Sequence, residues 1–236
     1  INSNIIGFYN ILECCKISKV KNLLYASSSS VYGGNTKIPF SENDSVNHPV
    51  SIYAATKRSN ELMAHSYSHL YGISCTGMRF FTVYGPWGRP DMAPMIFADA
   101  IINKKNLKIF NHGNMSRSFT YIDDVIEIII RLIQKPAMPD KSFDTRNPKS
   151  ATSWCSNRIF NIGNENSVGL LNFIETLEHE LGFEAEKEFD SLQKGDVVNT
   201  LSDNSTINKW IGVYPKTPLK KGVKIFLNWY KSYYKY

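Results

Sequence analysis

The chain has 236 residues, of which 42 % are hydrophobic, and a formal net charge of +6. This composition is that of a globular protein with a sizeable core, and it excludes a disordered chain. The four cysteines lack metal-ligand spacing, and charged residues interrupt the longest apolar run, residues 125–133, so a disulfide scaffold and a bilayer-spanning helix are also excluded. Free thiols and the lack of an N-terminal apolar signal segment predict a cytoplasmic location.

Two helix–strand alternations fill the first 85 residues. Apolar residues at helical spacing predict a helix over residues 4–15, and the apolar run 20–27 predicts a buried strand. A polar loop follows, then a helix over 52–71 and a strand over 74–81. This alternation is typical of a parallel, doubly wound sheet, so we predict an α/β fold.

The pattern after residue 85 is looser but still alternates between helices and strands. The expected helices cover residues 93–103, 122–134, 169–181 and 223–234, and the expected strands cover residues 107–111 and 158–162. Asp123 and Asp124 fall at the start of one of these helices, where negative charge is favourable, so we interpret them as a helix-start charge pair and not as a metal site.

Tyr53 and Lys57 lie one turn apart on the predicted helix over 52–71, and therefore share a face. A tyrosine titrates near pH ~10 and is a poor base at neutral pH. A cation about 4 Å away stabilises the phenolate by roughly 4 kcal/mol at an effective dielectric constant of about 20. We therefore expect Lys57 to lower the pKa of Tyr53, which could then take a proton from a hydroxyl group.

Further motifs occur in order along the whole chain. They are Tyr25–Gly33, Arg79–Ala93, Asn111–Gly113, Arg117–Asp124, Phe160–Asn164 and Gln193–Val197. Together with the Tyr53/Lys57 pair, they make the chain resemble the extended short-chain dehydrogenase/reductases that act on nucleotide-sugars. Within that family, the resemblance is strongest to the bacterial UDP-glucuronate 4-epimerases.

The resemblance implies two domains. Residues 1–85 would be the remainder of a Rossmann-type NAD-binding domain, and residues 86–236 would form mainly a smaller α/β nucleotide-sugar-binding domain, with residues 121–165 partly returning to the first domain. No Gly-x-Gly-x-x-Gly or Gly-x-x-Gly-x-x-Gly occurs in the sequence. We therefore expect a C-terminal fragment or truncated product that lacks three βα units of roughly 30 residues each.

The implied reaction is the NAD-dependent 4-epimerisation of UDP-glucuronate to UDP-galacturonate, which would feed capsule or lipopolysaccharide synthesis. Tyr53 would take the proton from the sugar O4 while hydride passes from C4 to NAD and then returns to the other face of a 4-keto intermediate. Lys57 would hold the nicotinamide ribose, Ser28 would share the O4 proton, and Phe80 would belong to the cofactor site.

Ser29 and Ser30 distinguish this reaction from related ones. The similar sugar 4,6-dehydratases carry an Asp-Glu pair at these positions, and the similar UDP-glucuronate decarboxylases carry a glutamate at the second. Hydroxyl groups cannot do the same acid/base work at neutral pH. The two serines therefore favour an epimerase, and we count them among the catalytic residues.

The resemblance also implies a substrate site. Thr82 and Arg89 would contact the hexuronic acid, Arg117 would clamp the UDP pyrophosphate, and Asp196 would lie near the nucleotide ribose. A guanidinium is a natural partner for a carboxylate. Two residues depart from the family pattern, namely Ser118 in place of an aspartate and Lys194 in place of a proline.

The expected partner is a UDP-hexuronic acid, with no metal, nucleic acid or membrane partner. A homodimer is expected through the helices over 4–15 and 52–71. Two alternatives stay open. The chain could be a non-catalytic fragment that binds a UDP-sugar or a partner subunit, or it could be an epimerase of a neutral UDP-sugar.

Overall fold

The computed structural model describes residues 1–193 and 195–236, so the predicted departure at Lys194 lies outside the described residues. A three-stranded parallel sheet in the order β1-β2-β7 forms one half of the fold. The strands are Asn22–Ser28, Ser74–Phe80 and Asn157–Ile162. Because the register is uninterrupted, the carboxyl ends of all three strands meet at one edge of the sheet.

Helices cover both faces of this sheet. On one face, α1 (Phe8–Ile17) and α2 (Ile52–Tyr71) pack over a core that includes Tyr25 and Cys75. On the other face, α4 (Ile122–Gln134) and α6 (Ser205–Ile211) pack over a core that includes Met78, Phe160 and Ile162. The predicted doubly wound α/β fold is confirmed.

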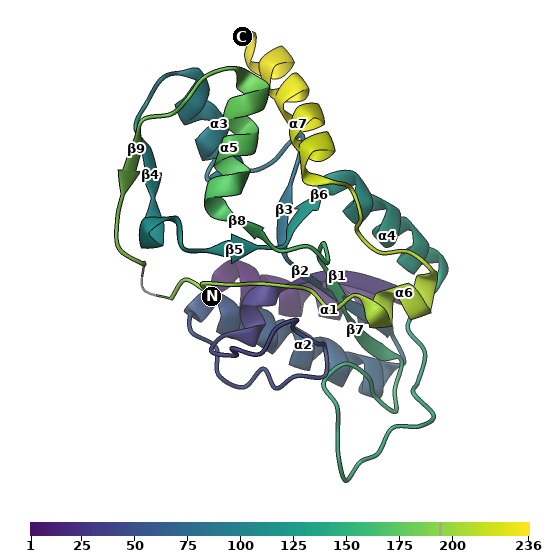
Figure 1. Ribbon diagram of the computed structural model, residues 1–236. Helices are drawn as coiled ribbons and strands as arrows, with labels where there is room; N and C mark the ends of the chain where they lie inside the picture. Colours follow the sequence, from purple (N-terminus) through teal and green to yellow (C-terminus); the bar gives the residue numbers. More distant parts are fainter. Residues whose placement is uncertain (194) are drawn as a thin grey trace.

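The other half of the molecule groups α3, α5 and α7 around three short two-stranded sheets (Figure 1). The helices are Ala93–Ile102, Leu170–Leu181 and Leu219–Tyr234. The sheets pair β3 with β6 (Thr82–Tyr84, Phe119–Tyr121), β4 with β9 (Leu107–Ile109, Lys187–Phe189) and β5 with β8 (Ser116–Arg117, Val168–Gly169). The core of this half combines aliphatic and aromatic side chains, and Phe119 stacks on Phe173 with a centroid distance of 4.0 Å.

The chain crosses between the halves more than once. Strand β3 follows β2 after a single residue and pairs with β6, and α4 then begins directly after β6 and returns to the first sheet. We propose the domain division at residue 85, with residues 121–165 partly returning, because this path supports it. The division itself stays a prediction.

The helices predicted over 52–71, 93–103, 122–134 and 169–181 and the strands predicted over 74–81 and 158–162 agree with the structure to within one residue. The bounds of α2 and α4 match, because Ser51 caps the start of α2 and Gly72, in the left-handed conformation, ends it. The N-terminal helix differs: a π-helical segment, Asn2–Gly7, precedes α1. The last helix starts at Leu219 and not at residue 223. The sequence analysis missed α6, the strands β3, β5, β6, β8 and β9, and the 3₁₀ turn Ser29–Tyr32. A second 3₁₀ turn, Phe110–Gly113, replaces the end of the strand expected over 107–111, so β4 ends at Ile109.

Candidate active site

Helix α2 carries Tyr53 and Lys57 on one face, as predicted. The Lys57 ammonium lies 6.0 Å from the centroid of the Tyr53 ring and donates a hydrogen bond of 3.0 Å to the carbonyl of Ala26 on β1. The Tyr53 side chain is 49 % exposed, so a ligand can reach it. Partial burial lowers the pKa of Lys57. The ammonium therefore bridges α2 and β1, and it keeps further N–H donors for a ligand.

The serine run ends β1 and begins the 3₁₀ turn Ser29–Tyr32. The Ser28 hydroxyl accepts a hydrogen bond of 3.2 Å from the backbone N–H of Ser30 and donates one of 3.1 Å to the Ser30 hydroxyl. Helix α2 packs against this turn. No hydrogen bond joins the Tyr53 phenol to a serine within the described residues, so the structure brings the two groups to neighbouring elements without linking them.

A buried ion pair that the sequence analysis missed lies under this site. Glu61 follows Lys57 by one helical turn, and Arg79 donates to it from β2 through two hydrogen bonds of 2.9 and 3.0 Å. Both side chains are almost completely buried. The Ser27 hydroxyl donates to the same carboxylate at 2.6 Å. The pair, with Ser27, thus joins α2, β1 and β2, and α2 is the helix that carries Tyr53.

The charges of this pair stabilise each other. Burial by itself would raise the pKa of Glu61, but the charge of Arg79 and the hydrogen bonds from Arg79 and Ser27 outweigh burial and lower it. Burial would lower the pKa of Arg79, and the Glu61 carboxylate raises it instead. A signal for this pair is present in the sequence, because Tyr53, Lys57 and Glu61 recur at intervals of four residues.

Arg117 and Asp196, both predicted substrate contacts, are brought together although 79 residues separate them. Their guanidinium and carboxylate groups form a hydrogen-bonded ion pair of 2.9 Å. Arg117 also donates to the carbonyl of Val198 at 2.8 Å. Burial lowers the pKa of Arg117, and the charge of Asp196 opposes that shift. The pair is therefore a fixed, partly buried anchor point.

The other predicted contacts lie in three different environments. Arg89 is exposed and pairs with Asp91 through hydrogen bonds of 3.1 and 2.5 Å, an acidic partner that the sequence analysis missed although it lies only two residues away. Thr82 starts β3 and is half-buried. Phe80 packs into the core shared with α4, on the sheet face opposite α2.

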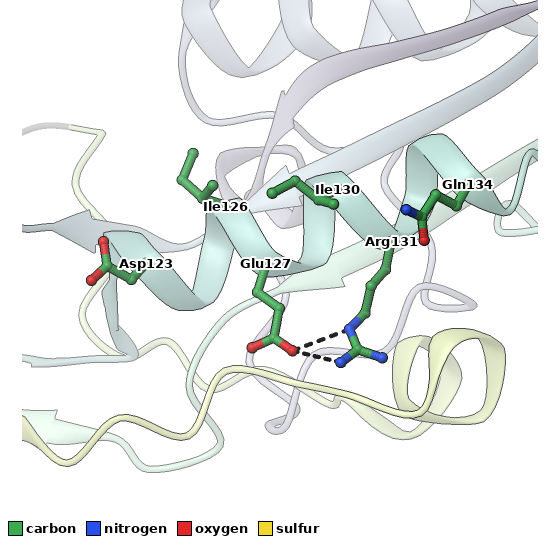
Figure 2. Close-up of a pocket in the computed structure, with 6 residues that line it drawn as sticks. All are labelled: Asp123, Ile126, Glu127, Ile130, Arg131 and Gln134. Atoms are coloured by element: carbon green, nitrogen blue, oxygen red, sulfur yellow. Dashed lines mark hydrogen bonds and ion pairs between the residues drawn. The ribbon is translucent and has the colours of Figure 1, made fainter.

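One cavity is lined by a predicted site residue, and a second cavity is not. A cavity of about 380 Å³ lies between the loop after the serine run and the segment 195–199, and Asp196 lines it. A larger hollow of about 620 Å³ is lined only by residues of α4, among them Ile126 and Ile130, and by none of the predicted site residues (Figure 2). No cluster of possible metal ligands occurs among residues 1–193 and 195–236.

Comparison with known proteins identifies the family. The NAD dependent epimerase/dehydratase family matches residues 1–163. Protein CapI of Staphylococcus aureus is 52 % identical, over 100 % of this chain and 70 % of that protein. The probable UDP-glucuronate 4-epimerase of Rhizobium meliloti is 43 % identical, over 100 % of this chain and 69 % of that protein.

A solved structure shows the same fold. The UDP-glucuronic acid 4-epimerase from Bacillus cereus, in complex with UDP-glucuronic acid and NAD, superimposes with a TM-score of 0.85 and 30 % identity, over 99 % of this chain and 69 % of that one. The chain thus spans about 70 % of the length of these relatives. Sequence and fold agree, and the chain belongs to the NAD dependent epimerase/dehydratase family.

Proposed function

We propose that this chain carries the catalytic and sugar-binding part of a UDP-glucuronate 4-epimerase, an isomerase. One observation carries the proposal: Lys57 ties the Tyr53 helix to the end of β1, where hydroxyl groups and not carboxylates follow Ser28. The relatives named for this activity support the substrate. The dehydratase and decarboxylase reactions need an acidic side chain that positions 29 and 30 do not offer.

The proton step would use Tyr53 and Ser28. The Tyr53 phenol is accessible to a ligand, and the Lys57 ammonium beside it favours negative charge at this position. Tyr53 would take the proton from the sugar O4 and return it after the sugar has turned. Ser28 would share this proton, which requires its hydroxyl to release its bond to Ser30 and turn towards the ligand.

Three further side chains would hold the substrate. Arg117, fixed by Asp196, offers a buried positive group to the pyrophosphate, and the cavity beside Asp196 offers space for the nucleoside. Arg89 would bind the hexuronate carboxylate. Because the Arg89 guanidinium already pairs with Asp91, the substrate carboxylate has to displace Asp91 or bind beside it. Thr82, between the two halves, would add a hydroxyl contact.

The residues present fit one end of NAD. Lys57 holds a single carbonyl and has two N–H donors left for ribose hydroxyl groups, next to an accessible Tyr53. When bound there, NAD supplies an acceptor and donor of hydride for the sugar C4. The glycine-rich segment that would hold the pyrophosphate does not occur in this sequence. NAD affinity is therefore the property that most needs measuring.

The test is the epimerisation of UDP-glucuronate in the presence of NAD, followed by separation of the two uronates. Tyr53→Phe should reduce turnover at least about a hundredfold, because general base catalysis contributes that much or more. Tyr71→Phe, at the other end of α2, is the matched control. Equal turnover by both variants would refute the role of Tyr53.

Substrate choice is tested at Arg89. Arg89→Gln should reduce turnover of UDP-glucuronate and leave that of UDP-glucose unchanged. Arg146→Gln is the matched control, because Arg146 is also exposed and also pairs with an aspartate two residues away. Turnover of UDP-glucose but not UDP-glucuronate by the parent chain would favour a neutral UDP-sugar epimerase.

One observation favours the alternative of a non-catalytic fragment. Within the described residues β1 pairs only with β2, so its other edge is open, and α4 exposes Ile126, Ile130 and Ile133. Calorimetric titration with NAD and then with UDP-glucuronate separates the two functions. Micromolar NAD binding supports the enzyme, whereas sugar binding without NAD binding supports the fragment.

We also propose a homodimer through the helices over 4–15 and 52–71. Exposed apolar residues on both helices support it, with Tyr9 48 %, Ile11 52 % and Leu62 53 % exposed. Sedimentation of the parent and of Leu62→Lys would test the interface. A monomeric parent chain would exclude the dimer.

A further inference from the structure

The positive net charge of the protein comes entirely from its last 33 residues. Residues 1–203 hold 20 lysines and arginines against all 21 acidic residues, whereas residues 204–236 contain no aspartate or glutamate. The basic residues of this segment are Lys209, Lys216, Lys220, Lys221, Lys224, Lys231 and Lys235. All of them are exposed except Lys231, which is half-buried.

Helix α7 holds most of these lysines on its outer face. Its inner face is fixed, because Val223 and Phe226 are fully buried in the core and Gly222 lies against Tyr84 so closely that a Cβ there would be 2.1 Å from the Tyr84 hydroxyl. Lys220 and Lys224, four residues apart, therefore face outward together. Figure 1 shows α7 along the outer edge of the molecule.

This lysine face is left uncompensated within the protein. None of the seven lysine side chains forms an ion pair with the residues that the structure describes. Like charges four residues apart repel, and Lys220 and Lys221 lie in the first helical turn, where the helix dipole disfavours cations. An external anion would relieve both effects.

Two acidic groups that adjoin this segment have their own partners. Asp124 accepts hydrogen bonds from the backbone N–H groups of Lys216 and Thr217 at the connection before α7. Asp99, near the end of α7, forms an ion pair of 2.8 Å with Lys105. Neither carboxylate reaches a lysine side chain of the 204–236 segment, so the face keeps its charge.

Exposed aromatic rings lie on the opposite side of α7 from Lys220 and Lys224, because Trp229 and Tyr233 each follow one of these lysines by nine residues, or two and a half helical turns. Trp87 is 74 % exposed, and its ring centroid lies 5.0 Å from that of Tyr233 and 5.4 Å from that of Trp229 on α7. Its φ of 62° is unfavourable for so bulky a residue. Tyr233 and Tyr236 are 52 % and 57 % exposed. The rings are therefore not part of the lysine face, and the lysines alone provide its attraction for the acidic headgroups of a bilayer.

We propose that the lysine face of α7 binds the surface of an anionic lipid bilayer. Charge complementarity carries the proposal, since clustered lysines attract acidic headgroups and residues 204–236 contain no acidic side chain. Contact is peripheral, because no helix of the described residues is long and apolar enough to span a membrane. The proposal does not depend on the epimerase assignment.

The test is flotation of the 236-residue chain with vesicles of phosphatidylcholine alone and of phosphatidylcholine mixed equally with phosphatidylglycerol. Each lysine near an anionic surface strengthens partitioning about fivefold, so removal of four should weaken it by several hundredfold or more. The variant carries Lys220→Gln, Lys221→Gln, Lys224→Gln and Lys231→Gln. The control has the same net charge and carries Lys21→Gln, Lys37→Gln, Lys141→Gln and Lys149→Gln.

The proposal expects binding to the mixed vesicles only, loss of binding at high salt, loss in the α7 variant and retention in the control. Equal loss in the control would mean that net charge alone acts, and it would overturn the assignment to α7. Binding to a soluble polyanion such as heparin but not to mixed vesicles would overturn the bilayer as partner, as would binding to neither.

Discussion

The buried pair of Arg79 and Glu61 permits a sharp stability prediction. Each side chain is at most 1 % exposed, and two nearly parallel hydrogen bonds of 2.9 and 3.0 Å join them. Arg79→Met would leave the Glu61 carboxylate buried with only Arg58 and Ser27 as partners. Removal of one member of a buried pair typically costs about 3–5 kcal/mol, a large part of the ~5–15 kcal/mol that stabilises a domain.

A double-mutant cycle tests this reasoning. Arg79→Met and Glu61→Leu should each lower the free energy of unfolding in urea by about 3–5 kcal/mol, because each removes the two-pronged charged partner of a buried ionised group. The double variant should cost less than either single one, because no uncompensated charge remains. Should a single variant be unfolded in buffer, Arg79→Lys keeps the charge, loses the two-pronged contact and gives a smaller, measurable loss.

The matched control is the exposed pair of Glu127 and Arg131 on α4, joined at 2.7 Å (Figure 2). Arg131→Met should cost no more than ~0.5 kcal/mol, because water screens exposed pairs.

The Arg79 pair also predicts that stability depends on pH. The folded pKa of Glu61 is lowered, so its contribution is present above the unfolded pKa and is lost as the pH falls through the folded pKa. If the double variant lost as much free energy of unfolding as the two single variants together, the buried-charge argument would be refuted.

Three further predictions concern other buried groups. Gly222→Ala should lower the free energy of unfolding by about 1–3 kcal/mol although alanine favours helices by ~1 kcal/mol, because its Cβ would overlap the Tyr84 hydroxyl. Glu42→Gln should stabilise the fold increasingly as the pH rises above 4.5, since burial raises the folded pKa of Glu42 and its contribution is lost as the pH rises through that value. Burial raises the pKa of Cys75 to about 12, so a thiol reagent should label exposed Cys14 in the folded protein and Cys75 only after denaturation.

Each of these three has a matched control. Ser232→Ala, on the exposed face of α7, should leave stability unchanged, and an equal loss there would contradict the Gly222 argument. Glu127→Gln should show none of the pH-dependent gain, which denaturation at several pH values would detect. Cys14→Ser should remove the fast labelling, and fast labelling of Cys75 in the native chain would contradict its burial.

The sequence by itself determined the fold class, the long elements and the family. Helix α2 was predictable because its periodicity, serine cap and glycine stop are local properties, and α4 was predictable from its apolar periodicity and the aspartates of its first turn. The Tyr53/Lys57 pair was predictable for the same reason, since helical spacing places both residues on one face. The serine run and the order of the motifs then indicated the family, which the comparisons confirmed.

Only the tertiary structure decided which distant residues meet. Strands of two or three residues, such as β3 and β5, carry too little periodicity to be recognised and exist because a partner strand pairs with them. The Arg117–Asp196 and Arg79–Glu61 pairs join elements that only the chain path brings together. Local spacing thus determined which residues share a face of a helix, because that depends only on neighbours in the sequence. Strand pairing and burial decided which charged residues from distant segments form ion pairs around the site.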